Sequence, residues 1–369
     1  MITRTLVLAG ALYASVACGT EGRPATTQVW LEGPRLPQPV SNNAVAAVGT
    51  ADGVSVFSFL GIDSTKVWSG VTNVAYRWDT WTGEWREIDP VPGPGRLAST
   101  AQVVDGRIYV IGGYTVAEDG SEKSLPDVAI YDPVSDTWSR GADIPVPTDD
   151  AAAGIWGSDR IVLVSGWHDT GNIPNVQIYH PAADRWTQGT DILGVPVFGH
   201  TGTMVGDDFV YVDGTAVVPA RPRFAIDTAS WRGRFSDGGL EDPERPWSVD
   251  WVSAPPHPGP PLYRSASATV DGLALFIGGS DNPYNYNGIG YDGEPSSPVD
   301  QVLAFDPTGA DGAGLWRNLA APPAGTMDHR NAGVAGDRVY LVGGMVAGQV
   351  VSNRVWWAET RSLVADPMR

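Results

Sequence analysis

Short apolar strands that end in two glycines recur along the chain. The clearest copies are DGRIYVIGGY (105–114), DGLALFIGGS (271–280) and GDRVYLVGGM (336–345). Each copy has a turn, a strand of alternating apolar pattern and a glycine pair, which is typical of a β-hairpin followed by a sharp change of direction. Because the same unit recurs, the sequence predicts a protein built from repeated β-units.

A second pattern follows the first one within each unit. In VAIYDPVSDTW (128–138) and VLAFDPTGADGAGLW (302–316), a strand ends in an aromatic residue and aspartate, and a turn then leads to tryptophan. Two hairpins therefore make one repeat. Weaker copies pair 53–61 with 74–85, 160–167 with 176–186, and 208–215 with 223–231. With the unit that begins at 336, these copies predict six repeats.

These motifs resemble the kelch repeat, in which each repeat forms one four-stranded propeller blade. The residues that carry the resemblance are Gly112, Gly113, Tyr131, Asp132 and Trp138 in the second unit, and Gly278, Gly279, Phe305, Asp306 and Trp316 in the fifth. The glycine pair is incomplete in the first, third and fourth units, and the fourth offers either Trp231 or Trp251 as its tryptophan. We interpret all these residues as scaffold, because glycine permits close backbone approach and tryptophan fills the space between blades.

The two ends of the chain complement each other. NRVWWAET (353–360) supplies a third strand with no fourth, and TQVWLEGPRLP (27–37) looks like the missing one. Pairing them would close the ring and remove two exposed sheet edges. The sequence therefore predicts an all-β, six-bladed kelch propeller over 27–361, closed by an N-terminal strand. Blades are expected at about 41–91, 96–147, 148–197, 198–256, 262–323 and 327–360 plus 27–37, followed by a tail at 362–369.

The first twenty residues have the pattern of an export signal. Arg4 precedes an apolar run from Leu6 to Val16, which is too short to span a bilayer, and small residues precede Cys18. The stretch resembles a bacterial lipobox, which implies a signal peptide at 1–17, lipidation of Cys18 and a tether at 18–26. The expected location is the bacterial cell envelope, at the outer membrane. Ser15 and Ala17 also suit ordinary signal peptidase, so a secreted or periplasmic protein is the alternative.

Composition narrows the partners. The chain has 369 residues, 45 glycines, 30 prolines and 15 tryptophans, which indicates a turn-rich globular protein. A net charge of -18 with no basic stripe excludes nucleic acid and anionic membrane surfaces, leaving the lipid anchor as the membrane contact. The single cysteine allows no disulfide within the chain. We expect a monomer.

One face of the predicted propeller gathers the candidate binding residues. The loops between blades and the loops from the second to the third strand emerge on the same side, and loops on a rigid scaffold commonly carry binding. The segment SDNPYNYNGIGYDG (280–293) concentrates tyrosine and asparagine there, a composition similar to antibody paratopes. The predicted ligand-binding residues are Arg96, His168, His200, Arg264, Asp281, Asn282, Tyr284, Asn285, Tyr286, Asn287, Tyr291, Asp292, His329 and Arg330. A loop that satisfies its own turns is the equally weighted alternative for the segment.

No metal or cofactor site is predicted. Counting from Pro283 puts Asn285, Asn287 and Glu294 at positions of a calcium-binding loop, but proline replaces its first ligand. Kelch propellers that resemble galactose oxidase need a cysteine cross-linked to tyrosine, and Cys18 lies in the signal region. The five histidines have no close ligand spacing.

Two functions remain open. The favoured one is binding of a glycan, a peptide or an envelope protein without catalysis. The alternative follows from a resemblance in architecture to N-acetylneuraminate epimerase, which implies acid/base chemistry on an acidic sugar. Arg264, Arg330, His200 and His329 are the residues that could hold the carboxylate and move the proton.

Overall fold

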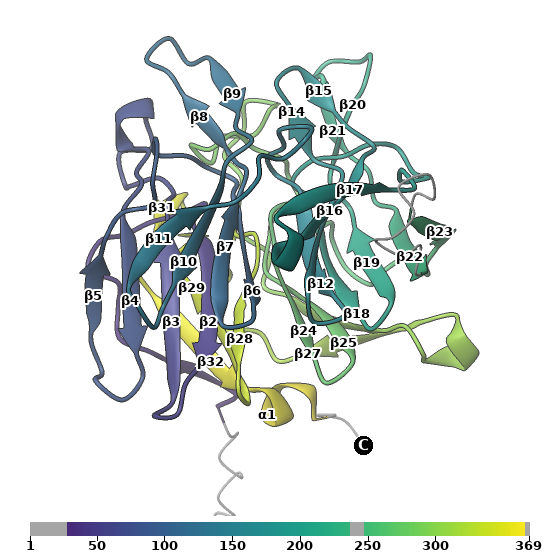
Figure 1. The fold of residues 1–369 in the computed structure, drawn as a ribbon. Helices are drawn as coiled ribbons and strands as arrows, with labels where there is room; N and C mark the ends of the chain where they lie inside the picture. The colour runs from purple at the N-terminus through teal and green to yellow at the C-terminus, as the bar shows by residue number, and fades with distance from the viewer. Residues whose placement is uncertain (1–27, 237–246, 366–369) are drawn as a thin grey trace, which may run out of the picture.

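The computed structural model describes residues 28–236 and 247–365. The predicted signal peptide, Cys18, the whole of the tether at 18–26 and residues 366–369 of the tail lie outside the described residues. Within them, six four-stranded antiparallel sheets are arranged around a central axis, which confirms the predicted six-bladed propeller (Figure 1). No helix in these residues is long and apolar enough to span a bilayer.

Each blade is one sheet. Its four strands are listed here in order from the innermost strand, which lines the central channel, to the outermost strand. Blade 1 contains β2 (Ala44–Gly49), β3 (Val54–Phe59), β4 (Ala75–Asp79) and β5 (Trp85–Ile88); blade 2 contains β6 (Thr100–Val104), β7 (Arg107–Ile111), β10 (Val128–Asp132) and β11 (Thr137–Arg140); blade 3 contains β12 (Ala152–Trp156), β13 (Arg160–Val164), β16 (Val176–His180) and β17 (Arg185–Gly189). Blade 4 contains β18 (Thr201–Val205), β19 (Asp208–Val212), β22 (Ser230–Ser236) and β23 (Ser248–Ser253); blade 5 contains β24 (Ala266–Val270), β25 (Leu273–Ile277), β26 (Val302–Asp306) and β27 (Leu315–Leu319); blade 6 contains β28 (Gly333–Ala335), β29 (Arg338–Val342), β32 (Val355–Glu359) and β1 (Trp30–Glu32).

The N-terminal strand closes the ring as predicted. β1 pairs antiparallel with β32, so that Trp30 lies opposite Ala358 and Glu32 opposite Trp356. The Trp30 side chain is 1% exposed and packs among residues of blades 5 and 6. The short helix α1 (Thr360–Val364) follows β32 and adds Leu363 to the same cluster. The two ends of the chain are therefore held together by the pairing of β1 with β32 and by the buried Trp30 side chain.

Six tryptophans fasten each blade to the blade before it. In every case the indole N–H donates to a backbone carbonyl of the preceding blade or of the segment that leaves it: Trp85 to Pro34 (2.8 Å), Trp138 to Asp89 (2.9 Å), Trp186 to Ala142 (2.9 Å), Trp251 to Thr190 (3.2 Å), Trp316 to Pro255 (2.8 Å) and Trp30 to Ala320 (2.7 Å). This pattern identifies Trp251, not Trp231, as the tryptophan of blade 4. Apolar clusters between neighbouring blades supply the rest of the core.

The third strand of blade 4 differs from the expectation. The segment 223–231 was predicted to form it, but Phe224–Ile226 forms β21 of a small hairpin, and the third strand is β22, which starts at Ser230. The apolar run FAI and the following turn imitate the repeat, so the sequence pattern alone selects the wrong strand.

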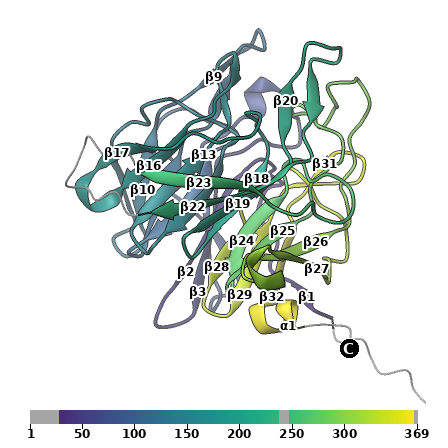
Figure 2. The same ribbon diagram turned by 90° about the vertical axis from the view of Figure 1, so that its right-hand side faces the viewer.

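Extra hairpins rise from one face of the ring. They are β8–β9 (Tyr114–Val116, Glu122–Ser124), β14–β15 (Trp167–His168, Gly171–Asn172), β20–β21 (Thr215–Val217, Phe224–Ile226) and β30–β31 (Met345–Val346, Val350–Val351). Each leaves its blade between the second and third strands. Figures 1 and 2 show β9 and β20 at the top and α1 at the bottom. We call the side with the hairpins the loop face. The one-turn helices η1 (Trp68–Gly70), η2 (Pro181–Ala183) and η3 (Ala310–Gly312) lie in connecting loops.

The glycine pair of blade 2 is needed where the second strand meets the loop face. Gly112 and Gly113 have φ of 64° and 97°, a backbone region that disfavours side chains. A Cβ on Gly113 would also lie 2.5 Å from the carbonyl oxygen of Leu97. The scaffold interpretation of this motif therefore has a steric cause.

Candidate functional site

A ring of equivalent backbone positions forms the neck of the channel below the loop face. One residue of each blade, just before its innermost strand, has positive φ: Asn42, Ala98, Asp150, Gly199, Arg264 and Asp328. Backbone bonds link successive positions, from Asp150 N to Ala98 O (3.2 Å), from Gly199 N to Asp150 O (3.0 Å) and from Arg264 N to Gly199 O (2.8 Å). The ring holds side chains of several blades at one depth on the axis.

Four charged side chains and one amide, which we call the neck cluster, meet at this ring: Asn42, Asp150, Arg264, Asp328 and Arg330. Arg264 is 2% exposed. Its Nε and Nη2 donate to the two carboxylate oxygens of Asp150 at 3.2 and 2.6 Å, and Nη1 lies 3.4 Å from Asp328 Oδ1. Arg330 Nη2 adds a second contact to Asp150 at 2.7 Å. Buried charges are stable only when paired in this way.

The arginines of the neck cluster keep Asp150 ionised. Burial alone would raise the pKa of Asp150, but Arg264 and Arg330 together hold it below its usual range. Asn42 connects the two ends of the cluster, because its Nδ2 donates to Asp328 Oδ1 at 3.1 Å and its Oδ1 accepts from Arg330 Nη2 at 2.9 Å. Both guanidinium groups are therefore paired with carboxylates within the protein, and Arg330 Nε alone among their nitrogens has no hydrogen-bond partner in the described residues.

A pocket of about 190 Å³ lies on the loop face beside the neck cluster. Three hairpins and the tyrosine-asparagine segment surround it. We define this loop-face pocket by its lining residues: Tyr114, Glu122, Asp149, Asp150, Trp167, Phe198, Phe224, Arg264, Asn285 and Tyr291.

Aromatic rings form one side of the loop-face pocket. The ring centroid of Trp167 lies 5.3 Å from that of Phe198 and 5.8 Å from that of Phe224. Phe224 lies 4.4 Å from Tyr291. These residues come from blades 3, 4 and 5, so the wall exists only in the folded ring.

Acidic groups form the other side. Asp149 is 3% exposed, and Ser124 Oγ donates to its Oδ2 at 2.6 Å. Burial, and then the negative charge of Asp150, raise the pKa of Asp149 well above its usual range. Glu122 stands at the exposed rim on β9. The pocket thus combines a buried carboxyl group that holds its proton with an apolar wall.

Of the predicted binding residues, Arg264, Asn285 and Tyr291 line this pocket. Arg330 belongs to the neck cluster, and His168 lies half-buried on β14 beside Asp169. Arg96 is fully buried between blades, and none of its guanidinium nitrogens has a partner among the described residues. Burial lowers the pKa of Arg96.

The predicted histidines His200 and His329 are structural in their contacts. His200 Nε2 lies 2.9 Å from Val164 O, and His329 Nε2 lies 2.7 Å from Thr326 Oγ1. Burial lowers the pKa of His200 to about 4 and that of His329 to about 3. Both rings are neutral near pH 7, and neither lines the loop-face pocket.

The tyrosine-asparagine segment largely satisfies its own turns. Asn282 Nδ2 donates to Asp292 Oδ1, Asn285 Oδ1 accepts from Tyr286 N, and Asn287 Oδ1 accepts from Ile289 N. Tyr284 is fully buried against Tyr263, with the ring centroids 5.1 Å apart. Asp281 and Asp292 are exposed, and Tyr286 is half-buried beside the cluster that contains Tyr114. Asn285 and Tyr291 are the members that the segment offers to the loop-face pocket.

Several pocket residues were absent from the predicted set. Asp149 and Tyr114 lie in loops that the sequence assigns to this face, so their position was foreseeable, although their convergence was not. Glu122 and Phe198 lie in no repeat motif, and Trp167 and Phe224 lie in the segments 160–167 and 223–231, which the repeat pattern assigns to the scaffold. The signal that could have found Trp167 is its place directly after the Ser165-Gly166 pair, where a loop onto this face begins.

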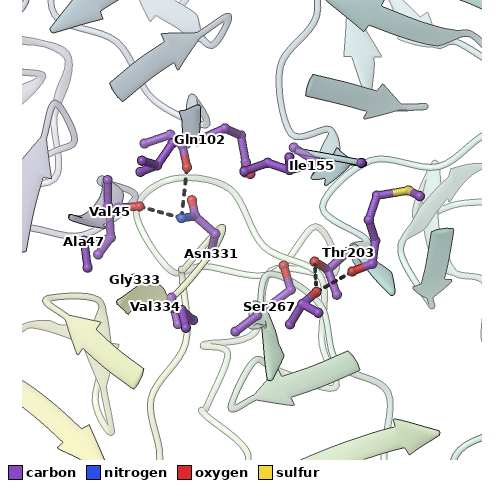
Figure 3. Close-up of a pocket in the computed structure, with 18 of the residues that line it drawn as sticks. Val45, Ala47, Gln102, Ile155, Thr203, Ser267, Asn331, Gly333 and Val334 are labelled. Carbon is purple, nitrogen blue, oxygen red and sulfur yellow. Dashed lines mark hydrogen bonds between the residues drawn. The ribbon is translucent and has the colours of Figure 1, made fainter. Parts of the chain in front are cut away.

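A second cavity, of about 410 Å³, lies in the channel where the innermost strands of all six blades meet (Figure 3). Small side chains such as Ala47 and Val334 line it. Asn331 bridges two blades by donating to the carbonyls of Val45 and Ala101, and Thr203 contacts Thr269 Oγ1 at 2.8 Å. The Asn331 amide nitrogen is taken up by backbone carbonyls and the two threonines bond each other, and no ionisable side chain except Asp207 lines this cavity, so it offers less chemistry than the loop-face pocket. Among the described residues, no group of three His, Cys, Asp or Glu side chains could hold a metal ion.

His257, near the loop face, gives a pH-dependent contribution to stability. Its Nε2 lies 2.9 Å from Asp213 Oδ2, and the two side chains are 4% and 0% exposed. Burial acts to lower the pKa of His257, but the hydrogen bond and charge of Asp213 outweigh it and raise the pKa above the usual value. Because the folded pKa exceeds the unfolded one, the stabilisation is complete below about pH 6.5 and lost as pH rises through the folded pKa.

We therefore expect His257→Asn to cost more stability, relative to wild type, at about pH 5.5 than at about pH 9. Urea midpoints at both pH values measure the difference. His180, whose pKa burial lowers, is the contrast: the wild-type advantage over His180→Asn should shrink at low pH. An equal cost of His257→Asn at both pH values would contradict the assignment.

Comparisons with known proteins agree with the repeat pattern. The model of the Kelch motif matches residues 95–145. The kelch-like protein terF of Aspergillus terreus is 32% identical over 104 residues, which cover 27% of this chain and 22% of that protein. N-acetylneuraminate epimerase of Haemophilus influenzae is 36% identical over 59 residues (16% of each chain), and N-acetylneuraminate epimerase 1 of Escherichia coli is 33% identical over 85 residues (22% of this chain, 23% of that one). The chain thus aligns with less than a quarter of each of these relatives.

A solved structure extends the likeness of the fold. The structure of YjhT superimposes with a TM-score of 0.68 at 16% identity, covering 88% of this chain and 95% of that one. The chain thus contains a Kelch motif at residues 95–145 and shares its propeller fold with YjhT, and its similarity in sequence to N-acetylneuraminate epimerases is confined to short stretches.

Proposed function

We propose that this propeller binds a ligand in the loop-face pocket and performs no chemistry on it. The observation that carries the proposal is the meeting of an aromatic wall, Trp167, Phe224 and Tyr291, with the buried carboxyl group of Asp149 in one pocket. Such a pocket, apolar with a few placed polar groups, is the usual form of a binding site. Ligands that suit it are a glycan, a peptide or a segment of an envelope protein.

The state of the cations favours binding over catalysis. Epimerisation of an acidic sugar needs a free cation for the carboxylate and a group that moves a proton. Arg264 is engaged by Asp150 and Asp328, and Arg330 by Asp150. Arg96 has no hydrogen-bond partner among the described residues, but it does not line the loop-face pocket. His200 and His329 are neutral and lie outside the pocket.

A sugar epimerase remains the second candidate. It is favoured by the short matches to N-acetylneuraminate epimerases and by the presence of Asp149 and Glu122 in the same pocket, since carboxyl groups can donate and accept protons. The likeness in fold does not carry the activity with it.

The two candidates separate in one NMR experiment on residues 19–369. A panel of acidic and neutral sugars and short peptides is added, and ligand line broadening and anomer exchange are followed together. We expect broadening by at least one panel member, lost in Phe224→Ala and kept in Trp81→Ala, a 45%-exposed tryptophan at a strand turn. Anomer exchange above the uncatalysed rate, lost in Asp149→Asn, would establish the epimerase instead. Broadening that survives Phe224→Ala would place the binding site elsewhere.

We also propose that the protein is exported and anchored through a lipid on Cys18 in the cell envelope, at the outer membrane, with the propeller as a monomer. The apolar run before Cys18 and the small residues beside it support this. Mass spectrometry of the mature N-terminus is expected to show diacylglycerol on Cys18. A mature chain that begins with an unmodified Cys18, as ordinary signal peptidase would leave it after Ala17, would refute the anchor and favour secretion.

A further inference from the structure

We propose that the loop-face pocket accepts a compact organic cation, an alkylammonium or quaternary ammonium group, between its aromatic wall and the carboxyl groups of Glu122 and Asp149. This inference rests on the proposed binding function of the same pocket. It narrows the ligand to one that carries such a head group.

The first argument is the charge balance of the lining. Three acidic residues line the pocket, Glu122, Asp149 and Asp150, against one cation, Arg264. Asp150 neutralises Arg264 by accepting two hydrogen bonds from its guanidinium group. Asp150 also forms an ion pair with Arg330. Within the described residues, neither Glu122 nor Asp149 forms an ion pair. Asp149 keeps its proton, so the unmatched negative charge in this pocket is that of Glu122, in a chain whose net charge of -18 attracts cations.

The nearest further cations do not cancel this imbalance. Lys123 follows Glu122 on β9, and successive strand residues point to opposite sides. Arg223 lies at the rim, where its guanidinium carbon is 5.5 Å from the Phe224 centroid and its Nη2 donates to Thr170 O. Arg223 shows that a cation is compatible with this wall, and within residues 28–236 and 247–365 no arginine or lysine lies over the ring of Trp167 or Tyr291.

The second argument is the aromatic wall. Aromatic faces attract cations within about 6 Å of the ring centroid, with tryptophan the strongest partner. The ring centroid of Phe224 lies 5.8 Å from that of Trp167 and 4.4 Å from that of Tyr291, so the three rings form one continuous wall. Proteins recognise quaternary ammonium ligands with such groups of aromatic rings, and a neighbouring carboxylate adds the attraction of opposite charges.

The third argument is size. Pockets that enclose whole small molecules typically have about 300–1,000 Å³. The loop-face pocket has about 190 Å³, which suits a head group whose remainder stays outside. An acidic sugar would instead have to bring its carboxylate against Glu122 and Asp149.

Proton linkage follows from the same geometry. Asp149 is surrounded by Asp150 and Glu122, by Arg264, and by Ser124, which in turn accepts from Asp169 N. Burial and the two neighbouring acids favour its neutral form. A bound cation would favour the ionised form, so affinity for the cation should rise with pH and binding should release a proton.

Titration calorimetry of residues 19–369 tests the inference with choline and its uncharged isostere 3,3-dimethylbutan-1-ol. We expect choline to bind about tenfold more tightly than the isostere, because cation–π and charge contacts are lost in the alcohol. Glu122→Gln and Trp167→Ala should each weaken choline binding. Glu118→Gln, the same change on the tip of the same hairpin but outside the pocket, should leave it unchanged. Circular dichroism confirms that each variant is folded.

The outcomes separate the two proposals. Equal affinity for choline and the alcohol, or choline binding indifferent to Glu122→Gln, would overturn the cation assignment. Failure of choline to bind would also overturn the cation assignment. In that case the proposed binding function still stands if a sugar or peptide binds wild type and Trp167→Ala abolishes that binding. If no ligand of either panel depends on Trp167, both proposals fail.

Discussion

Replacing Arg264 with methionine is expected to lower the free energy of unfolding by about 3–5 kcal/mol, because it leaves buried carboxylates without their counter-charge. Arg264 and Asp150 are each 2% exposed, and Asp328 is fully buried. Methionine fills much of the same volume, so the loss arises mainly from the unpaired charge. Urea denaturation measures it.

Two variants make this prediction specific. Arg140→Met breaks an equally short contact, 2.6 Å to Asp143, between exposed side chains, and is expected to change stability little. Adding Asp150→Asn to Arg264→Met should restore part of the stability, since it removes one stranded charge. If Arg264→Met costs no more than Arg140→Met, the neck cluster does not stabilise the fold as described.

Replacing Trp30 with alanine should destabilise the propeller by about 3–5 kcal/mol, the usual range for removing a large buried aromatic side chain. The residue fills the space between blades 5 and 6 and donates to Ala320 O at 2.7 Å. Because β1 closes the ring, the loss also frees the edge of β32. Thermal and urea denaturation both report it.

Leu31→Ala is the matched control for ring closure. Leu31 lies on the same strand and is 39% exposed, so its replacement should cost far less. Similar losses from the two variants would mean that β1 contributes through its backbone pairing alone, and that Trp30 is not the closing contact.

The sequence predicted the fold because its signals are local. The glycine pairs mark strand ends, where a Cβ would meet backbone, and the tryptophans mark the outer strands. Closure was also predictable, since an unpaired third strand at one end and a lone strand at the other have one obvious solution. The choice between Trp231 and Trp251 was not predictable, because it depends on the hydrogen bond of Trp251 to Thr190 in the preceding blade.

The site was predicted at the level of a face, not of its residues. Tyrosine and asparagine composition does not reveal that Asn282 and Asn287 bond within their own segment or that Tyr284 turns inward. The pocket depends on Asp149, Trp167 and Phe224, which are brought together from two blades by the ring. Their spacing of 18 and 57 residues along the chain follows no local rule.

The role of a charged residue also depends on its burial and on its partners in the fold. An arginine before an innermost strand suggests a ligand contact, but Arg264 is satisfied by Asp150 and Asp328. The pocket it borders is consequently aromatic and acidic, which shifts the expected ligand away from an acidic sugar.

The central claim is that the loop-face pocket is a binding site, and ligand-observed NMR on wild type and Phe224→Ala tests it most directly. The ligands are the sugars, peptides and ammonium compounds named above, and Trp81→Ala serves as the control. The account predicts that the ligands that bind wild type also bind Trp81→Ala and lose their signal with Phe224→Ala. Ligands that bind all three proteins equally would contradict it.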